Sequence, residues 1–220
     1  SRKLRKFESI LAKASGILAI SNKDYEYFKK SSHNVYLIPA YAGFDKVYIL
    51  EGQGDYVLYH GKLDVSENYN AAEFLIKEVF KGLDVKLKIA GMNPPHHLVK
   101  CAESEPNVEL IENPEDDDLQ ELIRNAQINI LVTAQSTGLK LKLLNALFNG
   151  RYCVVNDKMV EGLDINDLCI VANTGNEIKT VVSDLMTKPF VEEQVEIRKS
   201  RMDAFYNPSH ATDRLVELLG

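Results

Sequence analysis

The stretch INILVTAQSTGLKLKLLNALFNGRYCVV, residues 128–155, decides the fold of this protein. It opens with the apolar run Ile128–Thr133 and closes with the run Tyr152–Val155. Between these runs, a polar loop leads into a segment whose leucines have helical spacing. Two short β-branched runs joined by a helix form a strand–helix–strand unit, in which the strands are parallel and the crossover is right-handed.

The same alternation extends outward in both directions. Helical stripes lie at residues 72–80, 119–126 and 178–185. Further apolar runs with the length of strands are Tyr56–Tyr59, Val85–Ala90, Val108–Ile111 and Leu168–Val171. They are continuous rather than alternating, which is typical of strands buried on both faces of a sheet. The sequence therefore predicts an α/β fold with a doubly wound, Rossmann-like parallel sheet over about residues 54–190.

The two ends of the chain have a different organisation. Residues 1–50 hold a single β-α-β unit, in which Ser21 is expected to cap the helix. We expect residues 1–50 to be a remnant of an N-terminal domain with a linker, and residues 51–200 to form the sheet domain. Residues 201–220 are expected to form a C-terminal helix that packs back toward the N-terminal domain. Because the chain starts without Met and within a helical pattern, we interpret it as a fragment.

Composition and charge exclude several classes of protein. The formal net charge of -6 does not favour binding to nucleic acid or to an anionic membrane surface. No apolar run approaches the roughly 18 residues of a transmembrane helix. The three cysteines Cys101, Cys153 and Cys169 are an odd and sparse set without CxxC spacing, which indicates a reducing compartment.

Ligands of an open parallel sheet bind where strands end and helices begin. Three loops stand there: residues 59–63 with Gly61 and Lys62, residues 90–95 with Gly91, and residues 136–142. The third loop places Lys140 and Lys142 at the start of a helix, where the dipole disfavours cations unless an anion binds. This pattern favours a diphosphate site. The alternative is that both lysines are solvated surface residues.

Four motifs carry a resemblance to a known family: residues 17–39, 58–63, 137–155 and 160–163. Their order and spacing are similar to the signatures of the family 4-type glycosyltransferases, also called glycosyl transferases group 1. The resemblance implies the C-terminal, Rossmann-like domain of the GT-B fold, which holds a nucleotide diphosphate sugar. Residues 1–50 would then be the tail of the N-terminal acceptor domain and a linker.

The resemblance also implies which residues bind the donor. They are Gly61, Lys62, Gly91, Asn113, Thr137, Gly138, Leu139, Lys140, Lys142 and Asn145. Lys62, Lys140 and Lys142 would contact phosphate, and Asn145 would contact the ribose. The family's Glu-x7-Glu positions are Thr137 and Asn145 here, so neither is a carboxylate and no catalytic residue is identified.

The implied activity is transfer of a hexosyl group from a UDP- or GDP-sugar to the hydroxyl of a glycan or lipid-linked acceptor, in polysaccharide or glycoconjugate synthesis. The isolated fragment is expected to be inactive because the acceptor domain is missing. No cofactor, metal ion or nucleic acid is expected. The expected location is the cytoplasm, with the full-length protein peripheral at the inner face of the membrane. Two alternatives stay open: a non-catalytic glycosyltransferase-like module, and a sugar-nucleotide epimerase of the same architecture.

Three other patterns have a structural and a functional interpretation. His97 and Cys101 have the spacing of two metal ligands on a helix, but no further ligand is placed nearby. His60 is interpreted as a partly buried structural residue. The acidic run 115–118 follows Pro114 and is interpreted as the first turn of a helix, although such a run also resembles a Mg²⁺ site.

Overall fold

The structure is a computed structural model that describes residues 9–32, 34–38, 43–44, 46–135, 140–206 and 208–219 of the 220-residue chain. It divides into two compact units, one of residues 1–45 with 203–220 and one of residues 46–202. These boundaries lie close to the predicted ones at 50/51 and 200/201. The assignment of residues 1–50 to an acceptor domain, and the packing of residues 201–220 against that domain, stay predictions.

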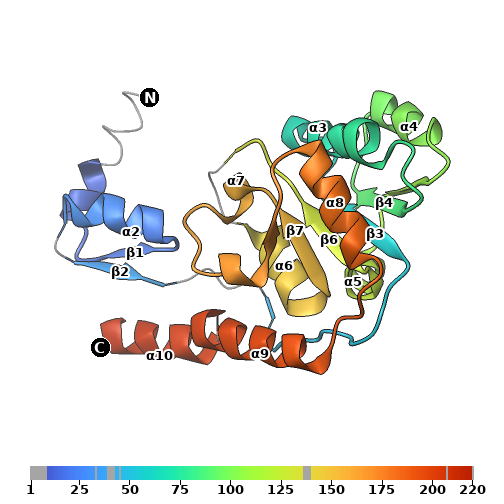
Figure 1. Ribbon diagram of the computed structural model, residues 1–220. Helices are drawn as coiled ribbons and strands as arrows, with labels where there is room; N and C mark the ends of the chain where they lie inside the picture. Colours follow the sequence, from blue (N-terminus) through green and yellow to red (C-terminus); the bar gives the residue numbers. More distant parts are fainter. Residues whose placement is uncertain are drawn as a thin grey trace. The chain divides into compact units, whose positions relative to one another are not determined.

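A parallel sheet forms the centre of the larger unit (Figure 1). In the described part of the chain, its six strands have the order β5-β4-β3-β6-β7-β8, and all neighbours are parallel. The strands are β3 (Tyr56–His60), β4 (Lys86–Gly91), β5 (Val108–Glu112), β6 (Ile128–Leu131), β7 (Tyr152–Val155) and β8 (Ile170–Val171). The chain winds outward from the middle in both directions, so the predicted doubly wound α/β fold is confirmed.

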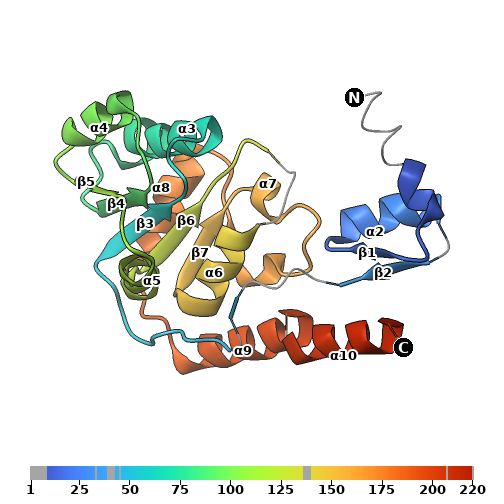
Figure 2. The same ribbon diagram turned by 180° about the vertical axis from the view of Figure 1, so that it is seen from behind.

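Helices cover both faces of this sheet (Figures 1 and 2). One face packs against α3 (Ser66–Phe74), a π-helical continuation (Leu75–Phe80), α4 (His96–Glu103) and α8 (Gly175–Leu185). The other face packs against α5 (Asp116–Asn125), beside which lies α6 (Leu141–Asn149). The short helices α7 (Asp157–Val160) and Asn166–Leu168 precede β8. Strands β3, β6 and β7 are buried at every position, as their continuous apolar runs predict.

Two predicted elements differ from the structure. The stripe over residues 72–80 continues as a π-helix from Leu75, with the amide of Lys81 bonded to the carbonyl of Ile76 at 3.0 Å. Leu75, Ile76, Val79 and Phe80 are all buried in this conformation, so the same apolar pattern fits either helix. The predicted strand 168–171 begins only at Ile170, because Leu168 ends a 3₁₀ helix.

The smaller unit contains one β-α-β element. Strands β1 (Ile17–Ala19) and β2 (Val35–Leu37) are parallel and joined by α2 (Asn22–Lys29). The predicted cap is confirmed, since the hydroxyl of Ser21 accepts a hydrogen bond from the amide of Asp24 at 3.1 Å. The remaining elements at the chain ends are a 3₁₀ helix (Ser9–Lys13), α9 (Glu192–Tyr206), which begins in the larger unit, and α10 (Pro208–Leu219). No helix within the described residues is long and apolar enough to cross a lipid bilayer.

Candidate functional site

The strand order places a topological switch point between β3 and β6. From β3 the chain proceeds outward to β4 and β5, whereas from β6 it proceeds the other way to β7 and β8. The loops that follow β3 and β6 therefore lead to opposite halves of the sheet. In folds of this kind, ligands bind at the carboxyl ends of the strands beside the switch point.

Three of the predicted backbone positions lie together at this edge. The amide of Gly61 donates to the carbonyl of Ala90 at 3.1 Å, and the amide of Asn113 donates to the carbonyl of Gly91 at 2.9 Å. A β-carbon at Gly91 would collide with the carbonyl oxygen of Gly61, so the two loops approach more closely than a larger residue allows. Asn113 has a φ of 51° and accepts the amide of Asn93 at 2.8 Å through its side chain.

Lys142 reaches across the switch point from the first turn of α6. Its ammonium donates to the Oδ1 atom of Asn68, in α3, at 3.3 Å and lies 5.4 Å from the centroid of the Tyr59 ring. The side chain is half-buried. Burial lowers the pKa of Lys142 to about 8, against the raising effect of the Glu67 carboxylate. The amine is therefore a partly desolvated cation at the place where the fold binds ligands.

Lys140 lies at the N-cap position of the same helix. Its ammonium donates to the carbonyl of Gln135 at 3.0 Å, and the residue is half-buried. Burial lowers its pKa, while Glu67 and Glu161 raise it. The neighbouring predicted donor residues Thr137, Gly138 and Leu139 lie outside the described residues, so their predicted roles stay predictions.

Lys62 contributes to this edge mainly through its backbone. Its side chain is 65% exposed and lies 3.6 Å from the carboxylate of Asp64. Its carbonyl oxygen accepts a hydrogen bond from the Nδ2 atom of Asn68 at 2.9 Å. Because Asn68 in turn accepts from Lys142, the carbonyl of Lys62 helps to orient the carboxamide that holds Lys142.

Asn145, the predicted ribose ligand, lies one turn after Lys142 in α6. Its carboxamide oxygen accepts a hydrogen bond from the Nδ2 atom of Asn149 at 2.8 Å. The residue is half-buried. A ribose hydroxyl at this position would meet a carboxamide oxygen that already accepts one hydrogen bond. Such an oxygen is a weaker acceptor than a carboxylate.

The structure adds Glu67 and Thr133 to the predicted set. The hydroxyl of Thr133, just after β6, donates a hydrogen bond to the Oε1 atom of Glu67, in the first turn of α3. Thr133 is buried and also accepts the amide of Gln135 at 3.2 Å. We call Tyr59, Glu67, Asn68, Thr133 and Lys142 the switch-point cluster. In the sequence, the only signal for Glu67 is its position at a helix start after the first loop.

His60 is the last residue of β3 and directly follows Tyr59 of the switch-point cluster. It is 4% exposed, and its buried Nε2 atom has no hydrogen-bond partner among the described residues. Burial, and next the positive charge of Lys142, lower its pKa to about 3. His60 is more deeply buried than the partly buried residue that the sequence predicted, its structural role stays a prediction, and the ring is neutral at physiological pH.

The other candidate patterns have structural roles. His97 lies 3.2 Å from the carboxylate of Glu73 and stacks edge-on with Tyr69 at 5.1 Å. Within the described ranges, no three His, Cys, Asp or Glu side chains gather as metal ligands would. Asp116, Asp117 and Asp118 form the first turn of α5, as the helix-start interpretation predicts.

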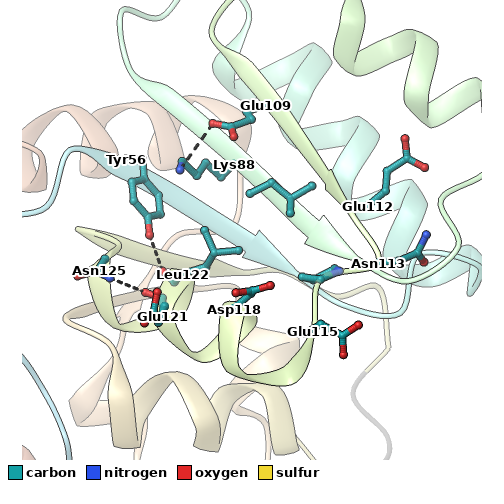
Figure 3. Close-up of a pocket in the computed structure, with 12 residues that line it drawn as sticks. Tyr56, Lys88, Glu109, Glu112, Asn113, Glu115, Asp118, Glu121, Leu122 and Asn125 are labelled. Carbon is teal, nitrogen blue, oxygen red and sulfur yellow. Dashed lines mark hydrogen bonds and ion pairs between the residues drawn. The ribbon is translucent and has the colours of Figure 1, made fainter.

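A cavity of about 600 Å³ lies between β5 and α5, and the predicted donor residue Asn113 is part of its lining (Figure 3). Its charged lining comprises Lys88 and the carboxylates of Glu109, Glu112, Glu115, Asp118 and Glu121. Lys88 lies 3.6 Å from Glu109 and over the ring of Tyr56. A diphosphate would be repelled by this excess of negative charge. The lysines at the switch point are therefore the better candidate site, although this cavity is large.

The fold is that of the Rossmann-like half of GT-B glycosyltransferases. TarM of S. aureus, solved with UDP, matches with a TM-score of 0.67 and 15% identity over 97% of this chain and 46% of its own. HepE of Anabaena, solved with UDP and glucose, matches with a TM-score of 0.72 and 9% identity over 98% of this chain and 66% of its own. A glycosyltransferase of Rickettsia africae matches with a TM-score of 0.68 and 12% identity, over 97% and 65%.

The model of the family described as glycosyl transferases group 1 matches residues 54–188. The chain belongs to this family, and the predicted resemblance is confirmed. It spans 46% to 66% of the length of the three solved proteins named above. No curated protein sequence gives a significant match.

Proposed function

We propose that residues 46–202 bind the nucleoside diphosphate of a UDP- or GDP-sugar, as the donor half of an enzyme that transfers the sugar to an acceptor hydroxyl. The observation that best supports this proposal is the half-buried ammonium of Lys142 at the switch point. A diphosphate there would gain a charge-assisted contact in a partly desolvated place. The main catalytic contribution of Lys142 would be to stabilise the leaving diphosphate.

Three further observations support the proposal. The chain belongs to a glycosyltransferase family, and two proteins with the same fold were solved with UDP. Lys140 begins the same helix as Lys142, so two cations gather where the helix dipole favours an anion. The glycines Gly61 and Gly91 also let the loops after β3 and β4 approach closely at this edge.

The proposal includes the wider role expected from the sequence. The acceptor is a glycan or a lipid-linked molecule held by a second domain, and the product is a polysaccharide or glycoconjugate. The reaction takes place in the cytoplasm, with the full-length protein peripheral at the inner face of the membrane. Neither a cofactor nor a metal ion takes part.

A second candidate function has one observation in its favour. Asn145 stands where the family has a carboxylate, and its carboxamide oxygen is already bonded to Asn149. A glycosyltransferase-like module that binds a nucleotide or a glycan without catalysis would tolerate this replacement. The two functions differ in whether the natural full-length protein releases nucleoside diphosphate from a nucleotide sugar.

Isothermal titration with UDP, GDP and their glucose and mannose esters tests the proposal. The variant Lys62→Ala/Lys140→Ala/Lys142→Ala is expected to bind at least about tenfold more weakly than the wild type. A control variant, Lys86→Ala/Lys100→Ala/Lys188→Ala, changes the net charge equally at exposed lysines away from the switch point. Equal affinity of the first variant and the wild type would overturn the site. If the full-length wild type binds no nucleotide, the non-catalytic module is the better conclusion.

A further inference from the structure

Glu67 is an acidic residue within a site proposed for an anion. It lies in the first turn of α3, whereas the lysines come from the first turn of α6, and the two helices follow the strands on either side of the switch point. Glu67 is half-buried, and a buried hydroxyl, that of Thr133, holds its carboxylate. The carboxylate is therefore held at the end of β6 rather than extended into solvent.

Glu67 lies beside the lysines, because the residue that follows it contacts the ammonium of Lys142. Its negative charge raises the pKa of both Lys140 and Lys142, against the lowering effect of burial. Asn68, the next residue, accepts the ammonium of Lys142 at 3.3 Å. Lys140 and Lys142 thus both interact with the negative charge of Glu67, and Lys140 interacts with that of Glu161 as well.

A simpler role for Glu67 is to complement the dipole of α3, as acids in a first turn often do. That role does not need a partner on another element. The hydrogen bond from Thr133 joins residues 66 positions apart and fixes the carboxylate toward the neighbouring strand end. Its effect on two lysines of a third element is also independent of the dipole of α3.

We propose that Glu67 makes the site selective for ligand charge, so that it prefers an esterified diphosphate over a free nucleoside diphosphate. This inference rests on the proposed function. In a nucleotide sugar, each phosphate carries one negative charge. In a free nucleoside diphosphate, the terminal phosphate gains another charge above about pH 6. A fixed carboxylate beside the lysines repels that additional charge, because charges a few ångströms apart interact strongly in a partly desolvated place.

This selectivity would make the site bind the donor of the reaction in preference to its product. The donor of the proposed reaction is the ester, and the product left on this half is the free nucleoside diphosphate. Glu67 therefore weakens binding of the product more than binding of the donor. The lysines attract both molecules, and the carboxylate distinguishes them.

Titration calorimetry of the full-length protein with UDP and with UDP-glucose, and with GDP and GDP-mannose, tests this inference. In Glu67→Gln, the Kd of the free diphosphate is expected to fall about tenfold and that of the ester only about threefold. The preference for the ester would then shrink by roughly threefold. Glu73→Gln is the matched control, since it changes the same charge on the same helix at a residue paired with Lys77 and His97. Both of its Kd values are expected to equal those of the wild type.

Glu67→Ala is a second variant, in which the charge and the hydrogen bond to Thr133 are both removed. Thermal unfolding shows whether each variant is folded. An unchanged ratio of the two Kd values, or weaker binding of the free diphosphate in both variants, overturns the charge selectivity. Such a result would leave the proposed function in place. Failure of the wild type to bind any of the four ligands would instead overturn both proposals together.

Discussion

At the scale of single residues, the proposed site depends on the ammonium of Lys142, whose charged form is disfavoured by burial. Lys142 is half-buried, and its hydrogen bond to Asn68 and the nearby charge of Glu67 compensate only in part. A charged amine held in this way destabilises the protein without ligand, and an anion offsets the cost when it binds. Removing the charge should therefore affect binding and folding with opposite signs.

Lys142→Met keeps the aliphatic chain and removes the ammonium. We expect the Kd of UDP or GDP to rise about tenfold or more, because a charge-assisted contact contributes roughly 1.5–3 kcal/mol. The free energy of unfolding without ligand should stay the same or increase. Calorimetry and urea unfolding measure the two effects, with Lys100→Met, an exposed lysine of α4, as the control. A loss of stability equal to the loss of binding would contradict this account.

The pKa of Lys142 also predicts how binding depends on pH. A bound diphosphate favours the charged amine, so affinity is complete below about pH 8 and declines by up to about tenfold per pH unit above it. The groups beside the amine are Glu67, Lys140, Tyr59 and the neutral ring of His60. Burial lowers the pKa of His60 to about 3 and raises that of Tyr59 well above its ordinary value, so neither of these two groups titrates in this range.

Unfolding does not account for such a decline. The pKa of Lys142 is lower in the folded protein than the 10.5 of an unfolded chain, so this residue makes the fold more stable as pH rises from about 8 to 10.5. Calorimetry between pH 6.5 and 9.5 measures the decline, and Lys142→Met should lose it. A wild type whose affinity is constant over this range would contradict the assignment of phosphate to Lys142.

At the scale of elements, Arg198 of α9 forms hydrogen bonds to the C-terminal end of α6. Arg198 is 4% exposed, and its guanidinium donates to the carbonyls of Leu147 and Gly150 at 3.2 and 3.4 Å. It also donates to the carbonyls of Arg151 and Leu168. A cation here satisfies the carbonyls that the C-terminus of α6 leaves without helical partners.

Arg198→Met should cost about 3 kcal/mol of unfolding free energy, because it leaves several buried carbonyls without donors. Urea unfolding with Lys199→Met as the exposed control measures this difference. The cost should appear without a change in nucleotide affinity, since Arg198 lies at the opposite end of α6 from Lys140 and Lys142. A variant as stable as the wild type would show that water replaces these bonds.

At the scale of the whole molecule, lysines and carboxylates concentrate at different places in the larger unit. Lysines gather at the switch point, whereas carboxylates line the cavity between β5 and α5 (Figure 3). The aspartates of α5 complement the dipole of their own helix. In the proposed site, a nucleotide would therefore take its counter-charge from the lysines rather than from a metal held by that acidic run.

Nucleotide binding is accordingly expected to persist in EDTA with an unchanged Kd. Asp116→Ala and Asp117→Ala should also leave the Kd unchanged, with a small loss of stability from the weaker helix start. Calorimetry with EDTA and with added Mg²⁺ or Mn²⁺ makes the comparison. Binding that requires the ion and disappears in both variants would instead indicate a metal site on α5.

The sequence alone predicted the order of strands and helices, the doubly wound fold and the position of the lysines. These features are local: continuous apolar runs follow from burial on both faces, and Lys140 and Lys142 begin the helix that comes after a strand and a loop. The motifs of residues 58–63 and 137–155 also predicted the family, which the match over residues 54–188 confirms.

Only the tertiary structure decided how the site is assembled. Lys142 meets Asn68 across 74 positions of the chain, and Thr133 meets Glu67 across 66. Both contacts exist because β3 and β6 are neighbours at the switch point, which brings the starts of α3 and α6 together. The spacing of residues along one strand or helix carries no information about which strand ends become neighbours. For the same reason Glu67, an ordinary acid at a helix start in the sequence, becomes a charge beside the lysines in the fold.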